Sequence, residues 1–510
     1  MSRPTGGRTS SPAGIQEAQH PGLTVERIAR LLDAEAAVAG KRPARSISID
    51  SRTLQPGALF VPLAGSRTDG HRFLAHALER GAAGLLVKRS LWRELSASVS
   101  AEARKAGAGV VLVGDTLEAL QELARRHLEQ HPKVFTVGIT GSSGKTTTKE
   151  ILASILEREA PTAASPGNLN SEIGLPLSCF EVTAEHRFVV FEMAINHPGE
   201  MDVLTRIASP ELAVVTNIGT AHVGLLGSRE AIAREKIRIA RRFDGRQAAF
   251  LYEDDEFFEL MAREVNGRVV SFGPRTTRGF EGSQDLGLDG TIVHWEGLQI
   301  RFPLFGFHNL LNALAALSVS AELGVGKSKI RDGLEAVQPL FGRSQILRGA
   351  VTVIQDSYNA NPDSVGRLTE FLDALPWDGR KLMVLGSMKE LGAEAEEAHR
   401  AIGRRISLAR FDHLFLFGEE MRWAMEALRE AASAGTAGRS AAAGPGAADD
   451  GGQTPFWTAD FDELRRRLQA TIRDGDLVVL KGSRSVELER LLSYLPVPAP
   501  PAGLSEGGGP

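Results

Sequence analysis

The chain has 510 residues, of which 42% are hydrophobic and 24% charged, a composition that supports several folded cores and excludes a disordered or fibrous protein. Its 59 basic and 63 acidic residues leave a net charge of -4 and form no dense basic stripe, so nucleic acid is not an expected partner. The single cysteine, Cys179, excludes a disulfide framework or a multi-thiolate metal site, and no apolar run could span a bilayer; we therefore expect a cytoplasmic protein without stable membrane insertion.

Short β-rich runs alternate with amphipathic helical stretches along most of the chain. The β-rich runs lie at 84–87, 110–114, 134–140, 187–193, 211–219, 381–386, 413–418 and 476–482. Buried strands separated by helices indicate parallel sheets, so the predicted fold class is α/β. At about 150 residues per domain, the length favours three domains.

These domains are predicted at 22–131 (N-terminal), 132–347 (central) and 348–495 (C-terminal). Segments rich in Ser, Gly and Pro predict disordered tails at 1–21 and 496–510. A similar stretch at 431–454 predicts a flexible insertion within the C-terminal domain, because helix and strand patterns resume after it.

The central domain opens with an apolar strand, a glycine loop and a helical run, in the sequence VFTVGI-TGSSGKTTT-KEILASILER. A glycine loop between a strand and a helix N-terminus places backbone N–H groups around a polyphosphate. The predicted nucleotide-binding residues of this loop are Gly141, Ser142, Ser143, Gly144, Lys145, Thr146 and Thr147. Lys145 would reach the outer phosphates and Thr146 would be available to Mg²⁺. Ile139 stands where the general P-loop motif has its first glycine, so this loop is a shortened variant.

Three further residues are candidate metal ligands. Glu192 ends the apolar strand FVVFE, where ligands gather in parallel sheets, although an exposed strand-end carboxylate is the alternative. His222 follows the next strand to the same rim, with a purely structural role as the alternative. Lys236 lies within the apolar stripe of a helix, where desolvation favours a neutral amine that could react with CO₂ to form an anionic carbamate. A lysine that extends to the edge of the stripe is the alternative there.

The order of these residues resembles the Mur ligases, ATP-dependent enzymes that form amide bonds in peptidoglycan precursors. The run GFHNLLNALAA at 306–316 is similar to the helix on the adenine side in that family, which implies that Asn309 and Asn312 lie near the base. The resemblance also implies nucleotide contacts from Arg343 and Asp356. It implies ATP and two Mg²⁺ ions as cofactors, with a carbamate on Lys236. The implied catalytic residues are Lys145, Glu192, His222 and Lys236, and the implied metal ligands are Thr146, Glu192, His222 and carbamylated Lys236.

Two stretches resemble one branch of the family, which joins D-alanyl-D-alanine to UDP-N-acetylmuramoyl tripeptide through an acyl phosphate. They are GNLNSEIGLP at 167–176 and DSYNANPDS at 356–364, and they imply substrate contacts from Asn168, Asn170, Tyr358 and Asn359. The stretch IDSRTLQPGALFVPLAGSRTDGHRF at 49–73, which we call the DSR segment, resembles the family's N-terminal domain that binds uridine diphosphate, and this implies that Ser51 and Arg52 are contacts.

The run KGSRSVELE at 481–489 is similar to the family's Rossmann-like C-terminal domain. The resemblance implies a monomer that acts on small-molecule substrates. The sequence departs from the family pattern at Tyr252, where Asn is usual, and at Ser387, where Asp is usual. A sister ligase, a folylpolyglutamate synthase and a regulatory protein that has lost ligation are the alternatives. The DSYNANP and DSR segments argue against the first two, and the presence of Lys145, Glu192 and Lys236 argues against the third.

Overall fold

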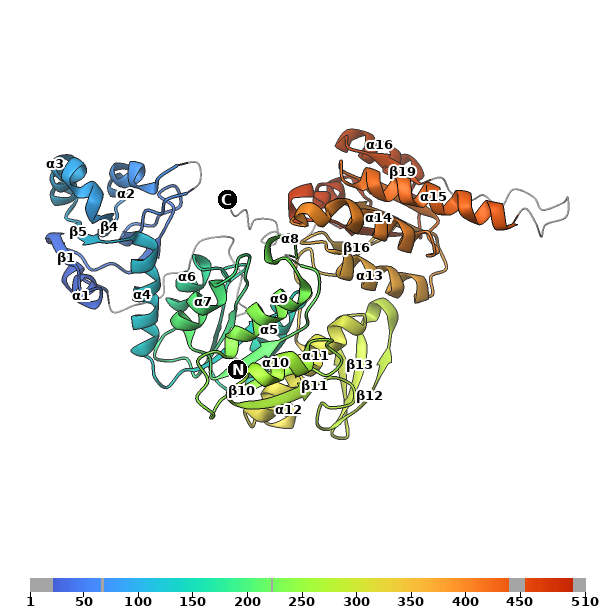
Figure 1. The fold of residues 1–510 in the computed structure, drawn as a ribbon, viewed down its shortest axis with the longest axis horizontal. Helices are drawn as coiled ribbons and strands as arrows, with labels where there is room; N and C mark the ends of the chain where they lie inside the picture. Colours follow the sequence, from blue (N-terminus) through green and yellow to red (C-terminus); the bar gives the residue numbers. More distant parts are fainter. Residues whose placement is uncertain (1–21, 66–67, 222, 440–454, 499–510) are drawn as a thin grey trace, which may run out of the picture.

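The computed structural model describes residues 22–65, 68–221, 223–439 and 455–498. Within these residues the chain folds into three α/β bodies arranged in sequence order, with the first and last at opposite ends of the molecule (Figure 1). The eight β-rich runs found in the sequence all contain strands of the structure, which confirms the predicted α/β class. No helix among the described residues is long and apolar enough to cross a membrane.

The N-terminal body has a five-stranded sheet in the order β1-β5-β4-β3-β2, parallel except for the edge strand β1. Its elements are α1 (Val25–Leu31), β1 (Glu35–Val38), β2 (Ser46–Ser48), β3 (Ala58–Phe60), the 3-10 helix η1 (Gly70–Phe73), α2 (Leu74–Glu79), β4 (Gly84–Lys88), α3 (Arg89–Ala106), β5 (Gly109–Val113) and α4 (Thr116–Glu129).

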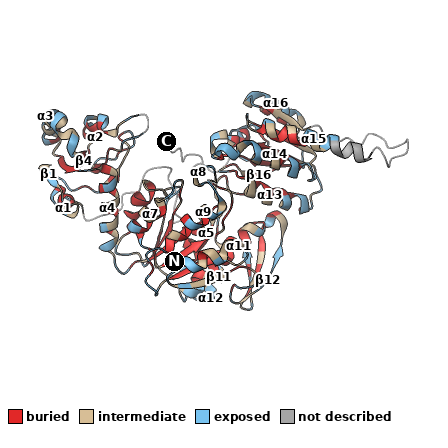
Figure 2. Ribbon diagram, in the orientation of Figure 1, coloured by how far each residue is buried: buried red, intermediate tan, exposed pale blue. Residues whose placement is uncertain are grey.

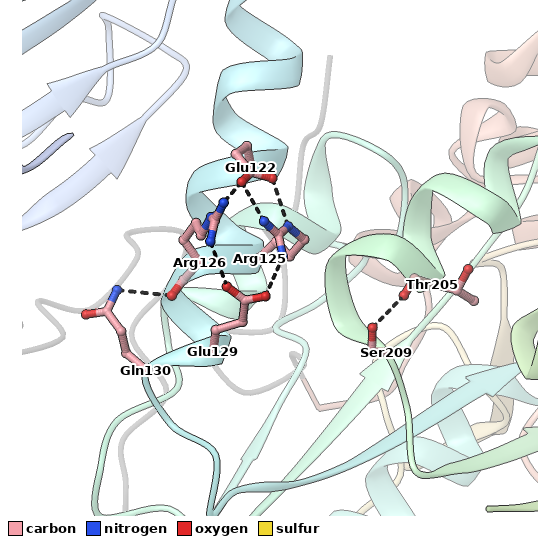
Figure 3. A network of polar contacts seen from close by, with 7 residues as sticks. All are labelled: Glu122, Arg125, Arg126, Glu129, Gln130, Thr205 and Ser209. Carbon is pink, nitrogen blue, oxygen red and sulfur yellow. Dashed lines mark hydrogen bonds and ion pairs between the residues drawn. The ribbon is translucent and has the colours of Figure 1, made fainter. Parts of the chain in front are cut away.

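Helix α4 joins this body to the central one. Its N-cap Asp115 accepts hydrogen bonds from two backbone N–H groups, and Leu120 and Leu123 pack into the large core that both bodies share. The opposite face carries ion pairs at helical i+3 and i+4 spacing among Glu122, Arg125, Arg126 and Glu129 (Figure 3). Exposed pairs of this kind contribute a few tenths of a kcal/mol each, so the buried face holds the helix in place.

The central body contains a six-stranded parallel sheet in the order β11-β10-β9-β6-β8-β7, followed by a three-stranded antiparallel sheet, β12-β13-β14. The elements of its large sheet and the helices between them are β6 (Phe135–Thr140), α5 (Lys145–Glu159), β7 (Thr162–Ala164), α6 (Gly174–Cys179), β8 (Phe188–Glu192), α7 (Glu200–Ala208), β9 (Leu212–Val215), α8 (Val223–Leu226), α9 (Arg229–Ile237), η2 (Arg238–Ala240), β10 (Ala248–Tyr252), α10 (Phe258–Glu264) and β11 (Arg268–Phe272). After them come β12 (Phe280–Asp285), η3 (Gly287–Asp289), β13 (Thr291–Trp295), β14 (Leu298–Phe302), α11 (Phe307–Glu322) and α12 (Lys327–Glu335).

The large central sheet is buried on both faces (Figure 2). In β8, Val189 and Phe191 join the core on the side of α6, α7 and α9, whereas Phe188 and Val190 join the core on the side of α5, α11 and α12. Because side chains alternate along a strand, Glu192 at the end of β8 belongs to the α5 side. Chain order reverses around β6, so ligands are expected beyond the carboxyl end of this strand.

The C-terminal body has a six-stranded sheet in the order β15-β16-β20-β17-β18-β19, parallel except for β15. Its elements are β15 (Gln345–Arg348), β16 (Thr352–Asp356), α13 (Pro362–Ala374), β17 (Lys381–Gly386), η4 (Gly392–Glu394), α14 (Ala395–Ile406), β18 (His413–Phe417), α15 (Met421–Arg439), β19 (Phe456–Thr458), α16 (Phe461–Thr471), β20 (Leu477–Lys481), η5 (Arg484–Val486) and η6 (Leu488–Tyr494).

In two of the segments predicted as irregular, part of the chain is ordered in the structure. Helix α15 continues to Arg439, so the first residues of the predicted insertion at 431–454 are helical, in keeping with their alanine content. At the other predicted tail, the carbonyl of Pro496 accepts a hydrogen bond from the backbone N–H of Ala350, which ties the chain to the sheet edge. The rest of the insertion and both remaining tails lie outside the described residues.

Candidate active site

A cavity of about 410 Å³ lies beyond the carboxyl end of β6. Its wall combines the loop after β6, the end of β8, one side of α11, the segment that links the central and C-terminal bodies, and the first loop of the C-terminal body. Such a cleft between bodies, at the point where strand order reverses, is the usual place for a nucleotide in an α/β protein.

The loop after β6 needs both of its glycines. Gly141 and Gly144 have φ angles of 146° and 82°, in the region that favours glycine. A Cβ atom on Gly141 would lie 1.8 Å from Thr216 Oγ1, and one on Gly144 would lie 2.3 Å from Asn312 Oδ1. Both contacts are with side chains of the chain itself. The glycines thus leave room for the side chains of Thr216 and Asn312, which pack against the loop.

Residues 142–147 of this loop line the cavity, whereas Gly141 does not. Lys145 begins α5, and its Nζ donates a hydrogen bond of 2.9 Å to the Gly141 carbonyl. Burial lowers the pKa of the Lys145 ammonium, and the nearby Glu192 carboxylate acts in the opposite direction. An ammonium folded back on its own glycine loop is placed to interact with phosphate oxygens that enter the loop.

The residues that follow β9 form hydrogen bonds with the glycine loop. Ser142 N donates to the Asn217 carbonyl over 2.9 Å, and Ser143 N donates to Asn217 Oδ1 over 3.2 Å. Gly219 N donates in turn to Ser142 Oγ over 2.8 Å. We call residues 217–220 the support loop, because it fixes the shape of the glycine loop.

Glu192 is 2% exposed and lines the cavity. The register pairs it with Ile139, just before the glycine loop. Its Oε2 accepts a hydrogen bond of 2.6 Å from Thr146 Oγ1, and its Oε1 accepts one of 2.8 Å from Asn170 Nδ2. This environment rules out an exposed strand-end carboxylate. A carboxylate and a hydroxyl side by side are oxygen donors of the type that Mg²⁺ prefers.

Among the residues that the structure describes, no group of three or more His, Cys, Asp or Glu side chains could hold a metal ion. Mg²⁺ commonly takes only one or two protein carboxylates and completes its shell with water and phosphate, so Thr146 and Glu192 fit such an ion. His222, a predicted ligand, lies outside the described residues.

Lys236 is 1% exposed and lies on α9 with the buried Ile232 and Ala233, so the structure excludes a lysine that reaches the edge of the stripe. Burial lowers its pKa well below the usual value, and the charge of Lys145 acts in the same direction. Within the described part of the chain, no side chain or carbonyl forms a hydrogen bond or ion pair with its Nζ. The residue does not line the cavity.

On the C-terminal side, the guanidinium of Arg343 lies 3.9 Å from the centre of the Tyr358 ring, and both residues line the cavity with Asn359. Asp356, at the end of β16, accepts a hydrogen bond from Ser344 N and forms an ion pair of 2.9 Å with Lys481 Nζ. Sequence reasoning missed Lys481, although the signal was present, because this lysine ends a buried strand as Glu192 does.

Asn309 and Asn312 of α11 also line the cavity, and both are buried. Asn309 Nδ2 donates to the Phe305 carbonyl, and Asn312 Nδ2 donates to Asn309 Oδ1. The rings of Tyr252 and Phe272, 6.0 Å apart, add an aromatic wall beside them. Asn168 and Asn170 approach from the segment after β7, so most of the predicted nucleotide and substrate residues share one cavity.

Ser51 and Arg52 do not join that cavity. They belong to the N-terminal body, far from the C-terminal one in Figure 1. Ser51 is buried with its Oγ 3.0 Å from His76 Nδ1, whereas the Arg52 side chain is 78% exposed and pairs with Asp50. Any substrate that contacts both this pair and the cavity therefore has to be long.

Comparison with known proteins gives the same family across the chain. The description "Mur ligase family, catalytic domain" matches residues 43–128, "Mur ligase middle domain" matches 139–320, and "Mur ligase, glutamate ligase domain" matches 342–484. The "UDP-N-acetylmuramoyl-tripeptide--D-alanyl-D-alanine ligase" of Treponema pallidum is 38% identical over 467 residues, which cover 91% of this chain and 95% of the relative.

Comparison with solved structures points to the same family. MurF from Acinetobacter baumannii superposes with a TM-score of 0.81 at 29% identity, over 93% of this chain and 99% of that one. MurF ligase from Thermotoga maritima in complex with ADP gives a TM-score of 0.71 at 28% identity, over 88% of this chain and 97% of that one.

Proposed function

Because the chain belongs to the Mur ligase family, we propose that it joins D-alanyl-D-alanine to UDP-N-acetylmuramoyl tripeptide at the expense of ATP. The observation that carries this proposal is the shared cavity. In it, the glycine loop and Glu192 of the central body face Tyr358 and Asn359 from the stretch that distinguishes this branch of the family. The Treponema pallidum relative described above carries the same activity in its name, and both solved structures are of MurF.

The reaction needs ATP because a carboxylate is a poor electrophile. The terminal carboxylate of the tripeptide attacks the γ-phosphorus, the bond between that phosphorus and the oxygen bridging to the β-phosphate breaks, and ADP leaves with that oxygen. The acyl phosphate then accepts the amine of D-alanyl-D-alanine, and inorganic phosphate leaves as the amide forms. In this scheme the loop N–H groups and Lys145 bind the phosphates, and Lys145 offsets charge on the transferred group.

We assign Thr146 and Glu192 to one Mg²⁺ ion, and Glu192, His222 and a carbamate of Lys236 to a second. Bound Mg²⁺ supplies further neutralisation of the phosphoryl oxygens. The hydrogen bond between Thr146 and Glu192 supports the first assignment, since it brings two oxygen donors together at the loop. The support for a carbamate is that Lys236 is buried and its pKa is lowered, which favours the neutral amine that reacts with CO₂.

Most of the other predicted contact residues line the cavity. Asn309 and Asn312 are proposed to face the adenine, and Arg343 and Asp356 to contact the nucleotide when the C-terminal body closes. Asn168, Asn170, Tyr358 and Asn359 are proposed to contact the peptide substrates. Ser51 and Arg52 are proposed to bind the uridine diphosphate, a role supported by the exposed guanidinium of Arg52. We also propose that the protein acts as a cytoplasmic monomer.

Phosphate release from ATP tests the proposal. It should require both UDP-N-acetylmuramoyl tripeptide and D-alanyl-D-alanine, because the amine has to resolve the acyl phosphate before the enzyme can turn over. Matched reactions would replace the dipeptide with single amino acids. Release driven by a free amino acid, or release that needs neither substrate, would contradict the proposed activity.

A further inference from the structure

The central and C-terminal bodies also touch beside the cavity, apart from the Arg348–Asp289 ion pair and the Phe305–Phe371 ring contact that join them elsewhere. Asp363, in the first turn of α13, accepts two hydrogen bonds at its Oδ2 from Thr220 of the support loop. The Thr220 backbone N–H donates over 2.8 Å and its hydroxyl donates over 3.0 Å. Asp363 does not line the cavity, and the activity proposed above gives it no role.

This contact requires a close approach of the two bodies. A Cβ atom on Gly219 would lie 2.3 Å from Asp363 Oδ2, so the neighbouring position has to lack a side chain. Next to it, α8 of the central body meets the segment before η4, where a Cβ atom on Gly224 would lie 2.6 Å from the Leu391 carbonyl. Figure 1 shows α8 between the central sheet and the C-terminal body. At this contact the two bodies approach closely through their backbones, and Asp363 is the charged group that joins them here.

The support loop has two faces. One face holds the glycine loop through Asn217 and Gly219, as described above. The other face holds Asp363 through Thr220. A displacement of the C-terminal body would therefore pull on the same short segment that shapes the phosphate-binding loop.

We propose that Asp363 is a positioning residue that anchors the C-terminal body to the support loop and so couples closure of the two bodies to the geometry of the glycine loop. A carboxylate that accepts two hydrogen bonds from neutral donors makes charge-assisted contacts, which are stronger than neutral ones. Such coupling is reciprocal, so nucleotide in the loop favours the closed arrangement and the closed arrangement favours nucleotide.

The test measures the distance between the two bodies directly. Cysteines placed at the exposed positions Gln299 in β14 and Ala470 in α16 accept spin labels, while the native Cys179 is buried and burial raises the pKa of its thiol. The distance distribution is recorded by pulsed electron spin resonance, with and without a non-hydrolysable ATP analogue. This arm does not depend on the proposed peptide substrates.

In the labelled parent protein, the analogue should narrow the distribution. Asp363→Ala removes both hydrogen bonds and should broaden the distribution toward longer distances, and Asp363→Asn, which keeps an acceptor without the charge, should lie in between. Gly224→Ala pushes the same interface apart sterically and should broaden it as well. Asp378→Asn is the matched control, because Asp378 is exposed and makes no hydrogen bond within the described residues of the C-terminal body.

The kinetic arm rests on the proposed ligase activity. Asp363→Ala should lower kcat for ligation about tenfold or more and should also raise the Kd of the ATP analogue about fivefold or more, because the closed arrangement that favours nucleotide is lost. Thr220→Val combined with Asp363→Ala should add little to the single change, since both remove the same contact.

An unchanged distance distribution in Asp363→Ala would overturn the proposal, whatever the kinetics. A distribution that broadens while kcat stays within twofold of the parent would overturn the coupling. Failure of the proposed function would look different: the parent protein itself would show no ligation, and the distance arm would still be readable.

Discussion

Replacement of Gly144 by alanine tests how the glycine loop is built. Gly144 is the N-cap of α5, with φ 82° and ψ -9°, and Gly199 is the N-cap of α7, with φ 89° and ψ -10°. Alanine in this left-handed conformation costs about 1–2 kcal/mol at either position. The two sites differ in their surroundings, because a Cβ atom on Gly199 meets nothing within 4 Å, whereas one on Gly144 would lie 2.3 Å from Asn312 Oδ1.

The additional cost at Gly144 follows from what Asn312 would lose. The displaced amide would give up its hydrogen bonds with Thr148 Oγ1 and Asn309 Oδ1, each worth about 1 kcal/mol. Gly199→Ala should therefore lower the free energy of unfolding by about 1–2 kcal/mol, and Gly144→Ala by about 3–4 kcal/mol. Urea denaturation of both variants beside the parent measures the difference.

The affinity for nucleotide should also distinguish Gly144→Ala from Gly199→Ala. Asn312 lines the cavity, so Gly144→Ala should weaken the affinity for a non-hydrolysable ATP analogue about tenfold or more, which corresponds to about 1.4 kcal/mol. Gly199→Ala should leave that affinity within twofold. Equal destabilisation by the two substitutions, or full nucleotide affinity in Gly144→Ala, would refute the packing argument.

Two further predictions concern buried ionisable groups. Lys236→Ala should bind the ATP analogue with nearly unchanged affinity, because Lys236 does not line the cavity, but should lose ligation by about a hundredfold or more; full activity would exclude the carbamate. Burial lowers the pKa of His308 to about 4 from an ordinary 6.5, so between these pH values the unfolded chain takes up a proton that the folded protein does not. Stability should thus fall as pH falls through this window, by about 2 kcal/mol for this group once its partial exposure is discounted, and His308→Asn should remove that part of the slope in urea denaturation at several pH values. An identical slope in the variant would show that His308 is not the group responsible.

The local parts of the site could be predicted from the sequence. The strand, glycine loop and helix at residues 134–158 form one continuous pattern, and Glu192 was found because polar residues at the end of a buried strand face the ligand edge of a parallel sheet. The meeting of Glu192 with the glycine loop depends only on neighbouring strands ending at one edge of the sheet. Lys481 also ends a buried strand, but it was missed because that strand is the last one of a different body.

Other features depend on contacts that have no sequence signature. The support loop holds the glycine loop through one hydrogen bond between backbone groups, which any residues could supply, and through the side chains of Asn217 and Ser142, whose partners no local pattern indicates. Strand β12 of the small antiparallel sheet is mostly exposed and lacks an apolar period, so its sequence pattern does not predict a strand. The contact between Asp363 and Thr220 joins residues 143 positions apart and depends on how two bodies meet.

The identity of the product tests the central claim most directly. The full-length protein is incubated with ATP, Mg²⁺, UDP-N-acetylmuramoyl tripeptide and D-alanyl-D-alanine, and the products are analysed by mass spectrometry alongside a phosphate assay. We expect a UDP-N-acetylmuramoyl pentapeptide that forms with equal amounts of inorganic phosphate and ADP. Recovery of unchanged tripeptide, or of a product that carries a single added amino acid in reactions that supply one, would contradict it.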